Sequence, residues 1–291
     1  MAFFNQNSTD VDLNNLNLKS IFLNYKFKIT LTLGLVILEN ILYLFFPLVL
    51  GFAINGLIQD NLVWLWALLF LGLGDMLVSA IRRFYDTRLY GKIYEDLTPG
   101  VVENEFKKTK KVSQVSARVD MLEELIDYFE ETLPEIIGTI ISLGGTLSIL
   151  YFLNLDVFTL ALIVMFLVMG IYRITKNKTS RLHTALNDTK ETQVDIVKHN
   201  SRKKTKTFSN KLMRCYINLS DLEMINYAVS FTLLITLICG SLYLIVQGGL
   251  KDYGAIFSIV LYLFNFLEDV TDMPVFYQNY IRLNEIMSRL K

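Results

Sequence analysis

Six apolar stretches alternate along this chain with polar stretches of very unequal length. The apolar stretches cover residues 29–54, 62–79, 134–153, 157–174, 228–247 and 253–267. Most of them approach the about 20 apolar residues that a helix needs to cross a bilayer. The second, fourth and sixth are shorter, and we expect them to lengthen into the residues that flank them. The pattern therefore predicts an all-α membrane protein with six transmembrane helices.

Two of the polar stretches, residues 84–133 and 175–227, are long and helical in pattern. In the first, Leu89, Ile93 and Leu97 recur four residues apart before Pro99-Gly100, and residues 119–133 continue a three-four spacing after it. We expect each stretch to be two membrane helices that continue into water and meet at a turn. About 20 residues of helix would carry that turn ~30 Å from the membrane. We call these two stretches the first and the second arm.

The chain begins with a polar segment that differs from a signal peptide. Residues 1–18 are rich in Asn and lack a basic start and an apolar centre. Residues 16–27 mix apolar side chains with Lys19 and Lys26, which suits either a short helix along the headgroups or the flank of the first span. We assign 1–28 to a cytoplasmic tail and 29–291 to one six-helix domain, because no Gly-, Pro- or Ser-rich linker divides the rest.

The distribution of charge predicts the orientation in the membrane. Basic and acidic residues balance at 28 each, so the total indicates no nucleic-acid partner. The three short loops, residues 55–61, 154–156 and 248–252, contain a single basic residue, Lys251, and every other Lys and Arg lies toward the opposite side. Under the positive-inside rule that side is cytoplasmic. We therefore expect both arms and both termini inside, in the cell (inner) membrane.

Composition supports the membrane class and offers little for catalysis. Hydrophobic residues make up 53% of the chain and the mean hydropathy is +0.40. Cys215 and Cys239 fall on one expected helix, too far apart for a disulfide. His183 and His199 have no zinc-ligand spacing. No G-x-x-x-x-G-K-[ST] phosphate loop and no nucleophile motif occurs. We expect no enzymatic activity, metal or cofactor in this chain, and ATP only through a partner.

The chain resembles the six-helix transmembrane domain of ABC exporters over nearly its whole length. Motifs in the first span, the first arm and the end of the chain carry this resemblance. The first span has Glu39 in its middle and Phe45-Phe46-Pro47 before residues 51–58 (GFAINGLI). The first arm and the chain end supply the remaining matches: residues 94–97 (YEDL), 101–108, 115–120 (VSARVD), 133–134 (LP) and 277–286 (YQNYIRLNEI).

The resemblance implies partners that these 291 residues do not contain. Exporters of this kind carry a nucleotide-binding domain, which is absent from this sequence. The resemblance also implies that the fourth and fifth helices reach across to a second subunit, so we expect a homodimer or a pair with a related chain. In the family, the arm tips pass the movements of the ATPase to the membrane helices. By resemblance, that role falls to residues 96–107, with Asp96, Glu103 and Lys107 as candidates.

The second arm contains a strongly basic run, residues 198–206. Arg202, Lys203 and Lys204 are its candidate contact residues. They would meet an acidic partner surface, or anionic lipid headgroups if the arm folds back. The alternative interpretation is a solvated helix face.

Polar residues inside the spans are the candidates for a cavity. Glu39 lies in the middle of the first span and Asp75 in the inner half of the second, where a charge near the bilayer centre costs at least about 2.5 kcal/mol. They should face the bundle interior, a partner or water, or take up a proton. Asp75, Ser79 and Arg82 share one helix face, which predicts that part of this polarity is satisfied locally.

The sixth span carries a polar stripe at i, i+3, i+4 and i+7. The stripe would line a water-filled cavity and favour cationic or polar cargo; its alternative is a set of contacts between helices. Its members are Asn265, Glu268, Asp269 and Asp272.

Three functions are compatible with these observations. The chain is the permease half of an exporter whose ATPase is a separate polypeptide, or a transporter driven by protons through its membrane carboxylates, or a scaffold or regulator that keeps the exporter fold.

The predicted orientation can be tested with a membrane-impermeant amine reagent on intact cells. We expect Lys251 to be labelled, and Lys108 and Lys204 to be labelled only after the membrane is permeabilised, because the arms lie inside. Labelling of Lys108 or Lys204 from outside would contradict the topology.

Overall fold

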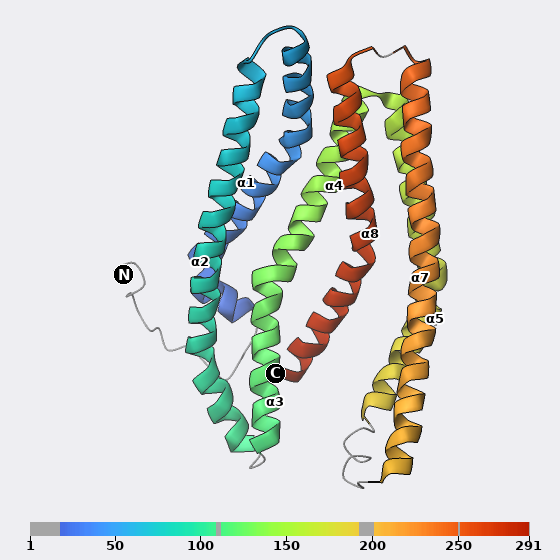
Figure 1. Cartoon of the computed structure of the whole chain (residues 1–291). Helices are drawn as coiled ribbons and strands as arrows, with labels where there is room; N and C mark the ends of the chain where they lie inside the picture. Colours follow the sequence, from blue (N-terminus) through green and yellow to red (C-terminus); the bar gives the residue numbers. More distant parts are fainter. Residues whose placement is uncertain (1–17, 109–111, 192–200, 250, 291) are drawn as a thin grey trace. The chain divides into compact units, whose positions relative to one another are not determined.

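The computed structural model describes residues 18–108, 112–191, 201–249 and 251–290, and all the regular structure in them is helical. Six segments are long and apolar enough to cross a membrane, which confirms the predicted six-span, all-α fold. In chain order the elements are α1 (Leu18–Ile58), α2 (Val63–Lys108), α3 (Val112–Asp127), the π-helix η1 (Tyr128–Thr132), α4 (Leu133–Leu153), α5 (Leu155–Glu191), α7 (Arg202–Gln247) and α8 (Tyr253–Leu290) (Figure 1).

The chain divides into two compact units. Unit 1 comprises Met1–Ser148 and Asp252–Lys291, and unit 2 comprises Ile149–Lys251. Unit 1 therefore contains α1, α2, α3, η1, α8 and most of α4, whereas unit 2 contains the end of α4, α5 and α7. In unit 2, α5 and α7 run side by side, and the Asn226 amide of α7 donates to Thr175 Oγ1 of α5 at 3.1 Å. The candidate site lies entirely in unit 1.

The first arm is a helical hairpin with its own apolar core. Helix α2 continues through Pro99 and Gly100 to Lys108, so Pro99 lies inside the helix and the chain reverses between α2 and α3 (Figure 1). The expected arm of two helices that meet at a turn is confirmed, but the change of direction follows Lys108 and does not fall at Pro99-Gly100. A proline inside a helix costs about 3 kcal/mol, which burial of the same helix face before and after it offsets. The core residues are Ile29, Leu89, Tyr90, Ile93, Leu97, Val101, Leu122, Leu125 and Ile126.

The start of α1 is continuous with the first span. The helix runs from Leu18 to Ile58 without a break, so residues 18–28 belong to the same helix as the span. The Tyr25 hydroxyl donates to Asp96 Oδ2 at 2.7 Å and ties this end of α1 to the arm. Residues 1–17 lie outside the described residues. That the segment up to residue 28 follows the headgroups stays a prediction.

Each short loop contains an Asn or Asp that caps the next helix. Asn61 Oδ1 accepts from the backbone N–H of Val63 at 3.0 Å, and Asn154 Oδ1 accepts from that of Val157 at 3.1 Å. Asp252 Oδ1 accepts from the N–H of Ala255 at 3.0 Å. Such caps satisfy amide groups that a helix start leaves without a partner. The hydrogen bond from Ala255, with that from the Asn55 amide, holds the pKa of the Asp252 carboxyl below its usual value.

Helices α1 and α8 touch through their backbones near these loops. A Cβ at Gly254 would lie 2.0 Å from the carbonyl oxygen of Gly51, so only glycine fits there. The Asn55 side chain accepts from the Gly254 N–H at 2.9 Å and donates to Asp252. One and two turns further along α8, Ser258 and Tyr262 donate to carbonyl oxygens of α1. This contact fixes the spacing of two walls of the site described below.

The apolar core of the first arm predicts that a substitution at Leu122 strongly lowers the stability of the protein. Leu122 of α3 is fully buried, so Leu122→Ala should lower the free energy of unfolding by about 3 kcal/mol, through lost apolar burial and the cavity left behind. Thermal unfolding of the purified protein in detergent measures this. Val112→Ala, on an exposed position of the same helix, is the control and should change stability little. Equal effects of the two variants would show that the arm has no packed core.

Candidate functional site

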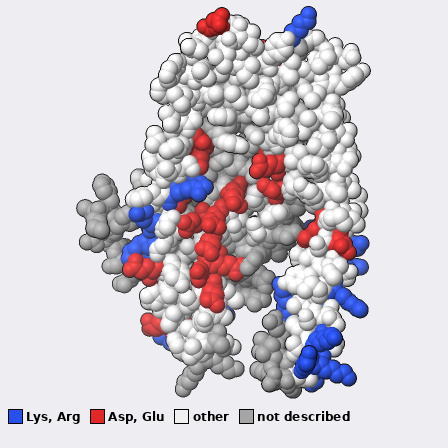
Figure 2. Space-filling view, in the orientation of Figure 1, with Lys and Arg blue, Asp and Glu red and all other residues white. Residues whose placement is uncertain are grey.

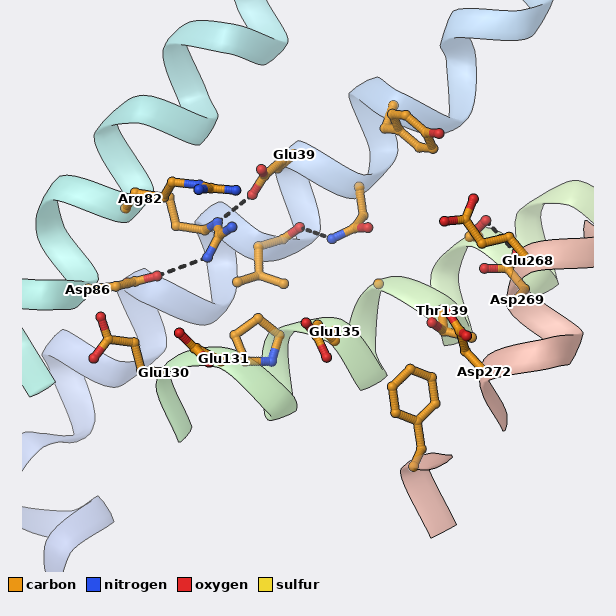
Figure 3. Close-up of a pocket in the computed structure, with 18 of the residues that line it drawn as sticks. Glu39, Arg82, Asp86, Glu130, Glu131, Glu135, Thr139, Glu268, Asp269 and Asp272 are labelled. Carbon is orange, nitrogen blue, oxygen red and sulfur yellow. Dashed lines mark hydrogen bonds and ion pairs between the residues drawn. The ribbon is translucent and has the colours of Figure 1, made fainter. Parts of the chain in front are cut away.

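Unit 1 contains an open cavity of about 960 Å³ between α1, α2, η1, α4 and α8. Each of the four α-helices lines it with side chains three or four residues apart, that is, with one face (Figure 3). In Figure 2, acidic side chains gather along a hollow in the middle of the face shown. The charged lining consists of nine carboxylates and two arginines: Glu39, Asp75, Asp86, Glu130, Glu131, Glu135, Glu268, Asp269, Asp272, Arg82 and Arg83.

An ion-pair network forms the α1–α2 wall of the cavity. Arg82 of α2 donates through Nε to Glu39 of α1 and through Nη1 to Asp86 Oδ2, the latter at 3.0 Å (Figure 3). The side chains of Arg82, Glu39 and Asp86 are 15%, 18% and 3% exposed, respectively. A single guanidinium therefore pairs with two carboxylates and joins two helices.

The expected local partnership of Asp75, Ser79 and Arg82 is wrong. Arg82 points instead to Glu39 and to Asp86, where it binds two carboxylates at once. Asp75 Oδ1 is buried and has no hydrogen-bond partner among the described residues. The one-turn spacing of Arg82 and Asp86 is visible in the sequence; the pairing with Glu39, on a different helix, is not.

The π-helix η1 places two further carboxylates at the cavity. Glu130 and Glu131 both line it, and the Thr87 hydroxyl donates to Glu130 Oε1 at 3.2 Å. Short π-helical segments are often found at functional sites. Glu135 follows on the first turn of α4. These residues were not expected at a site from the sequence, although three glutamates around Leu133-Pro134, at the start of a span, were a signal for them.

The polar stripe of α8 forms the opposite wall, with α4. Asp269 is 8% exposed and its Oδ2 accepts from Ser142 Oγ of α4 at 2.6 Å. Glu268 and Asp272 lie beside it in Figure 3 and are exposed. In the described part of the chain no Lys, Arg or His forms an ion pair with these three carboxylates. The α4–α8 wall therefore carries negative charges that no basic side chain of the described residues pairs with.

All six cavity candidates from the sequence lie in this one site. The structure brings together Glu39, Asp75, Asn265, Glu268, Asp269 and Asp272. Within the described residues, no group of His, Cys, Asp and Glu has the arrangement of a metal site. The arrangement favours binding of cations through charge and hydrogen bonds.

The arm candidates lie outside the cavity. Asp96 accepts from Tyr25 and pairs with Lys92 at 2.8 Å, within the first arm. Glu103 and Lys107 form an exposed pair at 2.8 Å. The candidates of the second arm begin α7 and are exposed, and basic side chains gather at that helix end in Figure 2: Arg202, Lys203 and Lys204. Their part in coupling stays a prediction.

The fold and the lined cavity define an integral membrane protein of the transporter class. The family described as the ABC transporter transmembrane region matches residues 18–253, and the chain belongs to this family. The protein is thus a membrane component of an ABC-type transporter, and the resemblance to ABC exporters is confirmed. No curated protein matches the chain at a significant level.

The Glu39–Arg82 pair predicts strong energetic coupling. In a double-mutant cycle of Glu39→Gln and Arg82→Gln, we expect a coupling energy of about 2 kcal/mol, because Arg82→Gln leaves the partly buried Glu39 without its cationic partner, whereas Glu39→Gln leaves Arg82 paired with Asp86. Thermal unfolding measures it. The same cycle on the exposed pair of Glu103 and Lys107 is the control and should give no measurable coupling. Additive effects of Glu39→Gln and Arg82→Gln would contradict the network.

Proposed function

We propose that this chain is the transmembrane part of an ABC exporter that moves cationic solutes through the acidic cavity of unit 1. The observation that supports this is the charge of the cavity lining, nine carboxylates against two arginines. A cleft with low-dielectric walls and charges of one sign concentrates ions of the opposite sign. A cation with an apolar body also fits the remaining lining, which includes Val36, Tyr43, Val275 and Phe276.

The energy source in this proposal is an ATPase on a separate polypeptide that binds both arms. The family supports an association with an ATPase, and these 291 residues contain no phosphate loop. In the first arm, α2 and α3 pack around a common apolar core. A displacement at the tip of this hairpin would therefore move both helices together. The second arm offers six exposed basic side chains and no acidic one between Arg202 and Arg214, which suits an acidic partner surface.

The same proposal includes two copies of the chain in the inner membrane, with both termini in the cytoplasm. The basic residues of the arms favour this orientation. Many apolar side chains of α5 and α7 are exposed in the single chain, including Ile174, Tyr243 and Val246. Lipid or a second subunit would cover them.

A proton-driven carrier is the second candidate. It is favoured by Asp269, a carboxylate 8% exposed that has a hydroxyl partner and no cationic one among the described residues. Such a group can carry a proton across a membrane protein. In that case transport would follow a pH gradient and not ATP.

Uptake into inside-out vesicles tests the proposal. Vesicles from the native cells should accumulate radiolabelled tetraethylammonium with ATP and not accumulate propanesulfonate, an anion. Glu268→Gln combined with Asp272→Asn should reduce cation uptake about tenfold, since it removes two unpaired carboxylates from the cavity. Asp60→Asn, in a loop outside the cavity, is the control and should leave uptake unchanged.

Three results separate the candidates. Vanadate-sensitive uptake that requires ATP supports the exporter. Uptake that persists without ATP and stops with an uncoupler shows the proton-driven carrier. If deletion of the gene changes the uptake of neither tetraethylammonium nor propanesulfonate, the protein is not a transporter of this class. The remaining candidate function is then a scaffold or regulator.

A further inference from the structure

The geometry points to Arg82 as the residue that limits how many positive charges a cargo can carry. We propose that its guanidinium is a built-in cation that holds Glu39 and Asp86, so that a cargo cation binds at the α4–α8 wall and a second positive centre cannot use these two carboxylates. This inference rests on the proposed function, and it adds a specificity-determining residue and a narrower substrate class.

On the α1–α2 wall, two of the three carboxylates, Glu39 and Asp86, already hold the guanidinium of Arg82. Arg82 binds Glu39 on one helix and Asp86 on the other, and the three side chains are 18% exposed or less. An external cation that approached Glu39 would have to displace a guanidinium that two carboxylates hold. Displacement would also leave Asp86, only 2% exposed, without its cationic partner. Glu39 and Asp86 are therefore not available to a second cation.

The α4–α8 wall is the part of the cavity that remains open to a cation. Glu268 and Asp272 are exposed, and among the described residues no basic side chain forms an ion pair with them. Figure 3 shows these carboxylates and Arg82 at opposite sides of the view, on α8 and α2. A cargo cation and the Arg82 guanidinium can thus be bound together, each with its own carboxylates.

The neighbouring residue Arg83 allows the effect of the Arg82 ion pairs to be distinguished from the effect of one positive charge in the cavity. Arg83 also lines the cavity, but it is exposed and forms no ion pair among the described residues. Loss of either arginine removes one positive charge from the lining. Only loss of Arg82 frees Glu39, which stands on a different helix from the carboxylates of α8. A second cation site should therefore appear without Arg82 and not without Arg83.

The experiment compares two ligands that differ by one charge. Hexamethonium has two quaternary ammonium groups on a six-carbon chain, and hexyltrimethylammonium has one. Calorimetric titration of the full chain in lipid nanodiscs gives both dissociation constants. The variant is Arg82→Gln combined with Asp86→Asn, which frees Glu39, does not leave Asp86 as a buried charge without a cationic partner, and keeps the net charge of the cavity.

In this variant we expect hexamethonium to bind about tenfold tighter than to the unchanged protein, and hexyltrimethylammonium to bind within twofold. Adding Glu39→Gln should abolish the gain, because it removes the second anchor. Arg83→Gln should tighten both ligands by less than about threefold, because it removes one positive charge from the lining and releases no paired carboxylate. Size-exclusion profiles and helical circular dichroism that match the unchanged protein establish that each variant is folded.

The inference is overturned if the affinity ratio of the two ligands is the same in the Arg82→Gln, Asp86→Asn variant as in the unchanged protein, or if Arg83→Gln changes that ratio equally. In both cases the proposed function stands, provided that the unchanged protein binds hexyltrimethylammonium better than neutral hexanol. If it binds the cation no better than hexanol, the cation-binding cavity itself is wrong, and the role of Arg82 falls with it.

Discussion

A carboxylate at membrane depth has to be hydrated, paired or protonated, and this constraint organises unit 1. The chain places acidic residues on α1, α2, α4 and α8, all of which carry membrane spans. They gather around one cavity, where several of them are exposed and where one arginine pairs with two of them. The helices arrange their remaining faces toward each other or toward lipid. The site and the packing of the bundle therefore have the same physical cause.

The rest of unit 1 holds the cavity walls in place. At one end, the contact of Gly51 with Gly254 and the hydrogen bonds of Asn55 join α1 to α8. On another side, η1 is a break in regular α-helix that presents two glutamates to the cavity. The arm core beyond it ties α2 to α3. A movement at the tip of the arm would therefore reach the cavity through packed helices and not through a flexible linker.

Much of this follows from the sequence, for reasons that differ between elements. Long apolar runs identify the six spans because the bilayer thickness sets a length. The stripe on α8, from Asn265 to Asp272, was predictable because helical periodicity places it on one face. Local sequence signals did not predict features that depend on tertiary packing. Pro99 lies inside a helix because apolar side chains on both sides of it are buried. The partner of Glu39 is Arg82 on another helix, and local spacing carries no information about it.

The sign of the electrostatic potential in the cavity tests the central claim most directly. A single cysteine at Asn265, with Cys215→Ser and Cys239→Ser to remove the other thiols, can be reacted with a cationic and with an anionic methanethiosulfonate of similar size. A hydrated, negative cavity predicts that the cationic reagent modifies Asn265→Cys at least about tenfold faster, and that added salt narrows the difference. Equal rates, or a faster anionic reagent, would show that the carboxylates are protonated or inaccessible and would contradict a cation-binding cavity.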